Sequence, residues 1–351
     1  MSTRIAARIR RIRPSPTVSM TARAEVLRSA GRDIIALSAG EPDFATPGHI
    51  SEAAREAIRA GATRYTAVDG SRSLKEAVIR KFRRDNGLRF EPDQILISSG
   101  GKQALYNALQ VLMQAGDEVI IPAPYWVSFP DMVKLADAEP VIVHTRAADG
   151  FRMTPKPLAT AITERTRGLI LNSPCNPTGS AYARADWEAL GAVLSEHPRV
   201  FIITDDIYEH IYWGAEPFCS FLTACPHLAE RTLIVNGVSK CYAMTGWRIG
   251  YAAGPAPVIR AMTAIQSQST TSACTIAQAA AEAALNGDQG CVAQMCAAFR
   301  ERHEVVTDRL NRLPGVDCRP CEGTFYAFPN MQGAIEAIGA GDDIRFCERL
   351  L

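Results

Sequence analysis

The middle of the chain alternates short apolar runs with amphipathic stretches. Apolar runs typical of buried strands occur at residues 94–97, 118–121, 140–143, 168–172, 200–204 and 232–236. Helix-like periodicity occurs between or before them, most clearly at residues 52–60, 73–86, 102–114 and 185–196. This alternation predicts an α/β fold with a mostly parallel sheet and helices on both of its faces, because each parallel connection needs a crossover.

The pattern changes after the last apolar run. A long helical stretch over residues 275–313 leads away from the sheet, and short strands are expected at residues 316–319 and 324–328. We therefore expect a smaller α+β domain beside the sheet. The predicted division is an N-terminal arm with part of the small domain at 1–46, a large domain at 47–295 and a partial small domain at 296–351.

The first thirteen residues carry five arginines, with Ile5, Ile9 and Ile12 at helix-like spacing. Two interpretations stay open. The one we favour is an amphipathic arm that packs on a partner subunit, and the other is an organelle-targeting peptide. Pro14 and Pro16 then punctuate the chain before a segment that we expect to be strand-like.

Composition narrows the classes of partner. The charges nearly cancel, with 38 Lys plus Arg against 37 Asp plus Glu, and no apolar run reaches the length of a membrane span. We therefore expect no nucleic acid or membrane partner and a small-molecule ligand. The ten cysteines are scattered, and the C-x-x-C pair of Cys318 and Cys321 has no second pair at zinc spacing. We expect no metal site, reduced thiols and a cytoplasmic protein.

The strongest chemical signal is Ser239-Lys240, directly after the apolar run at 232–236, with Arg248 eight residues later. A lysine at a buried strand end, flanked by small residues, can lose enough solvent to act as an amine nucleophile and form a Schiff base. Arg248 offers a planar set of donors suited to a phosphate. The alternative is a solvated lysine beside an arginine in an ordinary ion pair.

A second signal lies between the first predicted strand and the helix that follows it. Gly100, Gly101 and Lys102 stand there, so that backbone N–H groups at the start of the helix can hold a phosphate. A nucleotide P-loop is excluded, because that motif needs Ser or Thr after its lysine and Gln103 stands at that position.

These segments resemble a known family. The run Met244 to Tyr251 after Lys240 is similar to the cofactor-lysine motif of the class I/II aminotransferases, the fold-type I pyridoxal phosphate enzymes, and most of all to the bacterial aspartate aminotransferases. Other matching segments are residues 39–44, 100–104, 124–128, 172–179 and 205–209. The resemblance implies pyridoxal 5'-phosphate as the cofactor, a seven-stranded sheet sandwiched by helices, and transamination between amino acids and 2-oxo acids.

The resemblance also implies roles around the cofactor. Lys240 would hold the cofactor and then move the proton between the substrate Cα and the cofactor's C4′. Asp205 would face the protonated ring nitrogen, while Tyr208 and Asn176 would donate to the phenolic oxygen and lower the basicity of the Schiff base. Trp126 would stack on the ring. The phosphate would be bound by Gly100, Gly101, Lys102, Ser239 and Arg248.

Simpler roles stay open for four of these residues. Asp205 is also a plausible helix cap, because aspartate is common at that position after a strand. Tyr208 and Trp126 are also typical of core packing, and Asn176 stands in an Asn-Pro-Thr-Gly run that is a strong turn signal by itself.

The resemblance further implies a substrate site. Lys102, with help from Thr17, would bind the distal carboxylate of aspartate, glutamate and 2-oxo acids such as 2-oxoglutarate. A lysine in the first turn of a helix is otherwise unfavourable, which favours an anionic partner. Gly40 would border the substrate, and Trp126 and Asn176 would also contact it. Aromatic amino acids or prephenate stay open as alternative substrates.

Tyr65 matches the tyrosine that reaches the cofactor phosphate of a neighbouring subunit in this family. That match implies a homodimer with shared active sites. The alternative is a surface aromatic side chain in a loop.

The C-terminus departs from the family pattern. Relatives continue past the position of Leu351 and supply an arginine that grips the substrate α-carboxylate in a two-pronged ion pair. We therefore expect a C-terminally truncated chain with severely reduced turnover. Two other functions stay open, a C–S lyase on the same scaffold and a chain that binds the cofactor without turnover.

Overall fold

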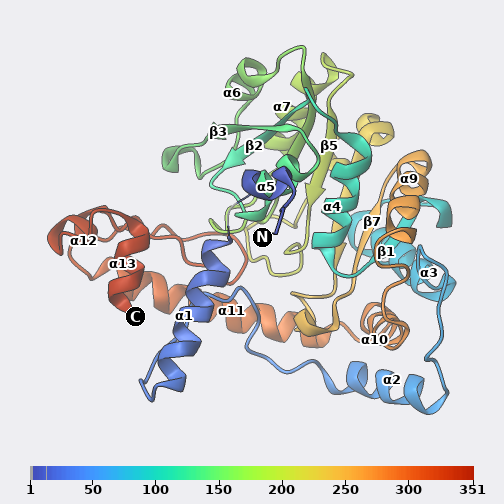
Figure 1. The fold of residues 1–351 in the computed structure, drawn as a ribbon, viewed down its shortest axis with the longest axis horizontal. Helices are drawn as coiled ribbons and strands as arrows, with labels where there is room; N and C mark the ends of the chain where they lie inside the picture. The colour runs from blue at the N-terminus through green and yellow to red at the C-terminus, as the bar shows by residue number, and fades with distance from the viewer. Residues whose placement is uncertain (1–2, 13) are drawn as a thin grey trace.

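A seven-stranded sheet forms the centre of the protein in the computed structural model, which describes residues 3–12 and 14–351. Its strands are β1 (Ile95–Ser98), β2 (Glu118–Ala123), β3 (Glu139–His144), β4 (Thr166–Asn172), β5 (Phe201–Asp205), β6 (Thr232–Gly237) and β7 (Gly250–Ala253). The spatial order is β1-β7-β6-β5-β4-β2-β3, and only β7 runs antiparallel to its neighbours (Figure 1). The predicted mostly parallel sheet is confirmed.

Helices cover both faces of this sheet, as the sequence predicted. One face packs on α4 (Gly101–Leu112), α5 (Ser128–Leu135) and α9 (Ala256–Ser267). The other face packs on α2 (Gly48–Arg59), α3 (Arg72–Lys81) and α10 (Thr275–Asn286) near β1, and on α7 (Arg184–Ser195) near β4. Side chains alternate between the two cores, with Leu96 and Val235 in one and Ile97 and Ile234 in the other, because strand residues point to opposite faces in turn.

Six further α-helices and six short helical segments complete the described part of the chain. The remaining α-helices are α1 (Pro16–Ser29), α6 (Pro155–Ala161), α8 (Phe221–Ala224), α11 (Gly290–Asn311), α12 (Gln332–Ala337) and α13 (Asp343–Leu350). The single-turn segments are η1 (Ala7–Arg11), η2 (Phe82–Asn86), η3 (Pro92–Gln94), η4 (Ala147–Asp149), η5 (Pro226–Arg231) and η6 (Thr245–Trp247). None of the helices within 3–12 and 14–351 is long and apolar enough to cross a membrane.

Local sequence signals explain where several elements begin. The hydroxyl of Ser71 accepts from the backbone N–H of Leu74 and caps α3, and the carboxylate of Asp342 accepts from Arg345 and caps α13. The central strands are apolar and almost fully buried, which is typical of parallel strands covered on both sides. Over the described part of the chain, no group of His, Cys, Asp and Glu side chains is arranged to hold a metal ion.

Two predictions for the C-terminal region were wrong in detail. The helical stretch at 275–313 is two helices, α10 and α11, because the backbone becomes extended at Gly287. The short strands at 316–319 and 324–328 do not form. The region instead contains two isolated antiparallel β-bridges, one between Asp317 and Asn330 and one between Tyr212 and Gly323. In the described part of the chain, no neighbouring strand pairs with these segments to extend the bridges into a ladder.

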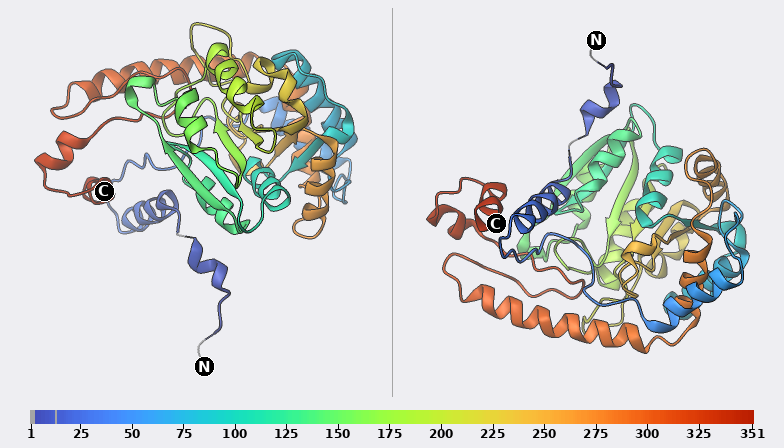
Figure 2. Two further views of the ribbon diagram at one scale, coloured as in Figure 1. Left: turned by 90° about the horizontal axis from the view of Figure 1, so that it is seen from above. Right: turned by 60° about the horizontal axis from the view of Figure 1, so that its bottom comes forward.

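The N-terminal region also differs from the prediction. The segment after Pro16 is the helix α1 rather than a strand, and Pro16 takes the first helical position, where its missing N–H costs nothing. Before it, η1 carries an ion pair from Arg11 to Asp137 and the chain projects away from the body (Figure 2). The predictions made for residues 1–2 and 13 lie outside the described residues.

Candidate active site

The predicted cofactor residues meet at the carboxyl ends of the central strands. The sheet pairs Asn172, the last residue of β4, with Asp205, the last residue of β5. Asp205 also pairs with Val235 of β6, the strand that leads to Lys240. Because the carboxyl ends of parallel strands share one edge of the sheet, the segments that follow them converge there.

Lys240 lies in the turn after β6. Its Nζ donates a hydrogen bond to the carbonyl oxygen of Gly40 at 2.6 Å, which brings the predicted substrate-side glycine to the predicted nucleophile. The same Nζ lies 5.9 Å from the ring centroid of Tyr208 and 5.8 Å from that of Phe325. Ser239, directly before it, is buried, and Lys240 itself is partly buried.

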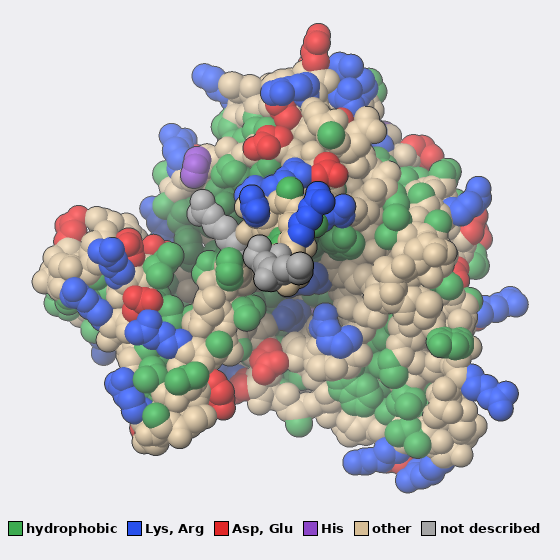
Figure 3. Space-filling view, in the orientation of Figure 1, with side chains coloured by type: hydrophobic (Ala, Val, Ile, Leu, Met, Phe, Trp, Pro, Cys, Tyr) green, Lys and Arg blue, Asp and Glu red, His purple; other side chains and the backbone are tan. Residues whose placement is uncertain are grey.

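The surroundings of Lys240 favour its neutral form. Burial and, to a smaller extent, the positive charge of Arg248 lower the pKa of Lys240 to about 8, against the opposite effect of Asp205. A lysine with this pKa supplies neutral amine closer to neutral pH than a solvated lysine does, which suits attack on an aldehyde. In the orientation of Figure 1, lysine and arginine side chains gather in a hollow near the centre of the molecular surface (Figure 3).

Asp205 is a buried carboxylate with few partners. Its Oδ1 accepts from the backbone N–H of Ile207 at 3.3 Å. Burial raises the pKa of Asp205 to about 7, while the Ile207 N–H and the charge of Lys240 act against that rise. Burial removes the hydration that stabilises a charged carboxylate, and a cationic partner can replace that stabilisation. A protonated pyridine nitrogen is such a partner.

A glycine-rich cradle faces Arg248 at the start of α4. Gly100 has φ 86°, a conformation that favours glycine, and a Cβ on it would lie 2.4 Å from Nη2 of Arg248. A Cβ on Gly250 would lie 2.2 Å from the backbone nitrogen of Gly101. Arg248 Nη1 donates to the carbonyl oxygen of Thr245 at 2.9 Å, which fixes the guanidinium. Helix N–H groups and a guanidinium thus converge in the way a phosphate requires.

Lys102 and Trp126, two of the predicted site residues, lie together beside this cradle. The Nζ of Lys102 is 4.7 Å from the centroid of the Trp126 ring, within the range of a cation–π contact. Burial lowers the pKa of Lys102, and the charge of Arg248 adds to that effect. The environment therefore penalises the cation and would be improved by an anionic ligand.

Tyr208 and Asn176 are joined by a residue that sequence reasoning missed. Tyr326 Oη lies 2.8 Å from Tyr208 Oη and accepts a hydrogen bond from Asn176 Nδ2 at 3.2 Å. The Tyr326 hydroxyl also packs on Gly40, where a Cβ would lie 2.3 Å from it. The one feature of the sequence that could have indicated Tyr326 was the neighbouring pair of aromatic residues, Phe325 and Tyr326. Such a pair is also typical of an ordinary β-strand.

Two predicted residues lie apart from this cluster. Tyr65 is 90% exposed and lines a surface cavity formed by the loop that carries it and by residues 272–276. Thr17 is exposed near the start of α1, where its carbonyl oxygen accepts from the Thr21 hydroxyl. Within residues 3–12 and 14–351, neither side chain contacts Lys240 or Lys102. Their roles stay predictions.

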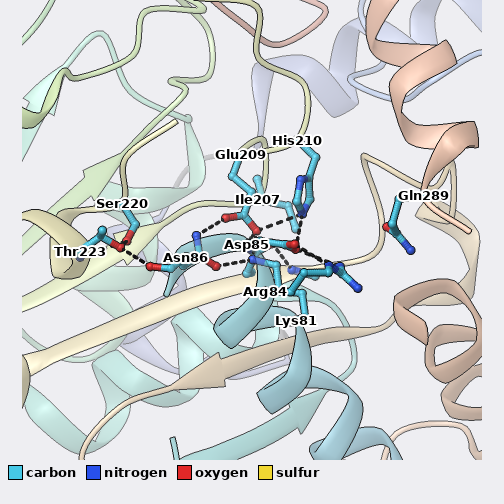
Figure 4. A network of polar contacts seen from close by, with 12 residues as sticks. Lys81, Arg84, Asp85, Asn86, Ile207, Glu209, His210, Ser220, Thr223 and Gln289 are labelled. Carbon is cyan, nitrogen blue, oxygen red and sulfur yellow. Dashed lines mark hydrogen bonds and ion pairs between the residues drawn. The ribbon is translucent and has the colours of Figure 1, made fainter. Parts of the chain in front are cut away.

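A buried polar network supports the segment that carries Tyr208 (Figure 4). Glu209 forms an ion pair with Lys81 of α3, and both side chains are almost fully buried. The amides of Asn86 and Asn236 donate to the Glu209 carboxylate at 2.8 and 2.7 Å. Because Asn236 belongs to β6, the network ties the Tyr208 segment to the strand before the lysine.

The arrangement fits pyridoxal phosphate. A desolvated amine, a phosphate cradle with a guanidinium, and a buried carboxylate that a cation would stabilise are the three groups that its aldehyde, phosphate and ring nitrogen need.

Comparison with known proteins identifies the family. The model of the family described as aminotransferase class I and II matches residues 32–351. The chain is 51% identical to an aspartate/prephenate aminotransferase of Nitrosomonas europaea, over 99% of this chain and 89% of that protein. The solved aspartate aminotransferase from Rhizobium meliloti is 47% identical with a TM-score of 0.92, covering 95% of this chain and 83% of that chain.

A second solved structure agrees. The aspartate aminotransferase from Thermus thermophilus with maleate is 41% identical with a TM-score of 0.90, over 97% of this chain and 90% of that chain. The fold, the site geometry and these matches agree in one assignment. The chain belongs to the class I and II aminotransferases, and it is an enzyme of pyridoxal phosphate-dependent transamination.

Proposed function

We propose that this enzyme transfers the amino group between aspartate or glutamate and a 2-oxo acid such as 2-oxoglutarate. The observation that carries this choice is the Lys102 cation over the Trp126 ring, where the nearby charge of Arg248 makes a second carboxylate on the substrate favourable. The names of the relatives, aspartate or aspartate/prephenate aminotransferase, support it.

The proposed roles follow from the contacts of the chain's own residues. The bound cofactor supplies an electron sink for the substrate Cα. Lys240 anchors the cofactor and, once released, carries the Cα proton, because its lowered pKa lets the amine accept and return a proton near neutral pH. Asp205 holds the ring nitrogen in its protonated form, and Tyr208 and Asn176 donate to the phenolic oxygen.

The substrate would lie between the cofactor and the Gly40 loop. Gly40 borders it, since its carbonyl oxygen already touches the nucleophile. Lys102 would bind the distal carboxylate, with Trp126 and Asn176 lining the same space and Thr17 assisting Lys102. The phosphate would be held by Gly100, Gly101, Lys102, Ser239 and Arg248.

The proposed assembly is a homodimer in which Tyr65 reaches the phosphate of the partner subunit. Its 90% exposure supports a contact outside its own chain. The arm adds apolar side chains, Ile5 and Ile9, that are 63% and 50% exposed. Hydrophobic side chains exposed on a projecting arm are typical of a subunit contact.

We also propose the division into residues 1–46, 47–295 and 296–351, with the first and last parts forming one small domain. An ion pair of 2.8 Å between Arg23 of α1 and Glu348 of α13 supports their association, as does a pair of 2.6 Å between Asp43 and Arg302 of α11. A cytoplasmic location is proposed in addition, which ten cysteines present as free thiols support.

Prephenate or an aromatic amino acid is the second candidate, because several relatives are named aspartate/prephenate aminotransferase. The deciding experiment is a titration of the cofactor-loaded protein with single amino acids, read at the visible absorption band. We expect aspartate and glutamate to convert the band at the lowest concentrations, and Lys102→Met to weaken these two selectively while phenylalanine changes little. Equal loss for all amino acids would contradict the role of Lys102. Release of pyruvate from cystathionine without band conversion would indicate a lyase.

A further inference from the structure

The side chain of Tyr326 makes contacts that the family assignment alone does not explain. It comes from the irregular segment after α11, yet its hydroxyl touches Tyr208, Asn176 and the Gly40 backbone. These three groups belong to three separate segments of the chain. The Tyr326 hydroxyl is therefore the point at which these segments are joined.

Both hydroxyls of the Tyr208–Tyr326 pair carry a proton, and the bound cofactor decides which of them donates to the other. Burial raises the pKa of Tyr326 to about 12 and raises the pKa of Tyr208 well above its usual value, so both hydroxyls are protonated at neutral pH. Tyr326 Oη already accepts a hydrogen bond from Asn176 Nδ2. Among the described residues, the Tyr208 oxygen is the one acceptor within hydrogen-bond distance of the Tyr326 hydroxyl. When Tyr326 donates to Tyr208, the Tyr208 proton is left for the phenolic oxygen of the bound cofactor, as the proposed role of Tyr208 requires.

This direction leaves the proton of Tyr208 available for another acceptor. A hydroxyl that accepts a hydrogen bond becomes a stronger donor, since chains of hydrogen bonds polarise one another. Tyr208 also lies against Lys240, whose Nζ is 5.9 Å from its ring centroid. The proton of Tyr208 can thus be directed to the side on which the nucleophile stands.

We propose that Tyr326 is a positioning residue that directs the Tyr208 hydroxyl toward the phenolic oxygen of the bound cofactor and strengthens that donation. The inference rests on the proposed role of Tyr208. A stronger donation to the phenolic oxygen stabilises its anionic form and lowers the pKa of the link between Lys240 and the cofactor. Tyr326 thereby tunes the pH at which the loaded enzyme changes its visible absorption.

The test is a pH titration of the visible band of the loaded protein. Tyr326→Phe should raise the midpoint by roughly 0.5 on the pH scale, because one supporting hydrogen bond is lost while the ring stays in place. Tyr208→Phe should raise it more. The double variant should titrate like Tyr208→Phe alone, because Tyr326 acts through Tyr208.

A matched control is Tyr182→Phe. Tyr182 is a buried tyrosine whose oxygen accepts from the backbone N–H of Met153 at 2.8 Å, so this change also removes one buried hydroxyl. Its midpoint should equal that of the unchanged protein, which separates a specific effect from a loss of packing.

Each other outcome is decisive. If the midpoint of the pH titration rises in Tyr208→Phe but stays the same in Tyr326→Phe, the inference is overturned and the proposed function stays intact. An unmoved midpoint in both variants would remove the proposed role of Tyr208 itself. A rise in the double variant well beyond that of Tyr208→Phe would show that Tyr326 acts independently, and failure of Tyr326→Phe to load cofactor while the control loads would make it a binding residue. Both results contradict the proposal.

Discussion

A fully buried lysine, Lys81, and a partly buried one, Lys240, lie in opposite electrostatic environments. Lys81 of α3 forms an ion pair with Glu209 and donates to the amide oxygen of Asn86 at 2.8 Å, all within the core. Lys240 donates to the carbonyl oxygen of Gly40, and the charge with the largest effect on its pKa is the positive guanidinium of Arg248. The first lysine has its charge satisfied by the protein, and the second does not.

The difference in environment corresponds to a structural role for Lys81 and a catalytic role for Lys240. A buried ion pair with complete hydrogen bonding holds a fixed geometry, and burial against like charge shifts the protonation of a group toward what catalysis needs. In this chain the two regions are connected, because Glu209 follows Tyr208 directly in the sequence. The network around Glu209 therefore holds the elements of the site without taking part in the reaction.

The largest expected effect is on turnover. Lys240→Ala removes the anchor and the acid–base group together, so we expect activity to fall by roughly 10⁴-fold. Lys81→Met should keep the cofactor attached and retain far more activity, even if it lowers stability. Steady-state rates and the visible spectrum of both variants check this. Comparable loss of attachment in the two would erase the distinction between the two lysines.

The second prediction concerns stability. Glu209→Gln leaves the Lys81 cation buried without its carboxylate, and we expect the free energy of unfolding to drop by about 3–5 kcal/mol. Adding Lys81→Met to that variant should restore part of the loss, because the uncompensated charge is then gone. Denaturant unfolding of the proteins without cofactor measures both. A double variant less stable than the single one would contradict this account of the ion pair.

The third prediction concerns the phosphate cradle. Arg248→Met should weaken cofactor binding roughly 10- to 100-fold, since a charge-assisted contact to phosphate contributes about 1.5–3 kcal/mol. Arg80→Met is the matched control, because within residues 3–12 and 14–351 the exposed Arg80 side chain bonds only the side chain of Asn286. Equilibrium binding of pyridoxal phosphate to the apoproteins provides the comparison. Equal affinity in both variants would place the phosphate elsewhere.

The smallest effect is on the pH dependence of loading. The neutral amine of Lys240 reacts, so the rate at which apoprotein takes up the aldehyde should rise with pH and level off above about 8. Lys102 carries a like charge that lowers the pKa of Lys240, so Lys102→Met should move this midpoint upward by less than about 1 on the pH scale. Stopped-flow absorbance follows the reaction. A downward move would show that Lys102 does not act on Lys240 by its charge.

The same pKa has a consequence for folding. The folded pKa of Lys240 is depressed from 10.5 to about 8, so the folded state binds its proton more weakly than the unfolded state does. The contribution of this lysine is thus unfavourable at neutral pH and is relieved as pH rises from about 8 toward 10.5.

Much of the site was predictable, because its residues follow apolar strands. Lys240, Asp205 and Gly100 each stand just after a strand or at its end, and parallel strands bring such positions to one edge. Tyr326 was missed because no strand end or turn marks it. It reaches the site through packing of a segment that lies 118 residues from Tyr208 in the sequence.

The fold shows the same limit. The seventh strand, β7, was not among the runs assigned from apolar periodicity, since it is four residues long and contains Gly250 and two alanines. The role of Lys81 also escaped prediction. It falls on the buried stripe of α3 with Leu74 and Val78, and only the fold places Glu209 opposite it.

The most direct test of the central claim is to locate the covalent link. The protein is loaded with pyridoxal phosphate, reduced with borohydride, digested and analysed by mass spectrometry. The account predicts that the pyridoxyl group is attached to Lys240. Attachment to Lys102 or another lysine, with Lys240 unmodified, would contradict it.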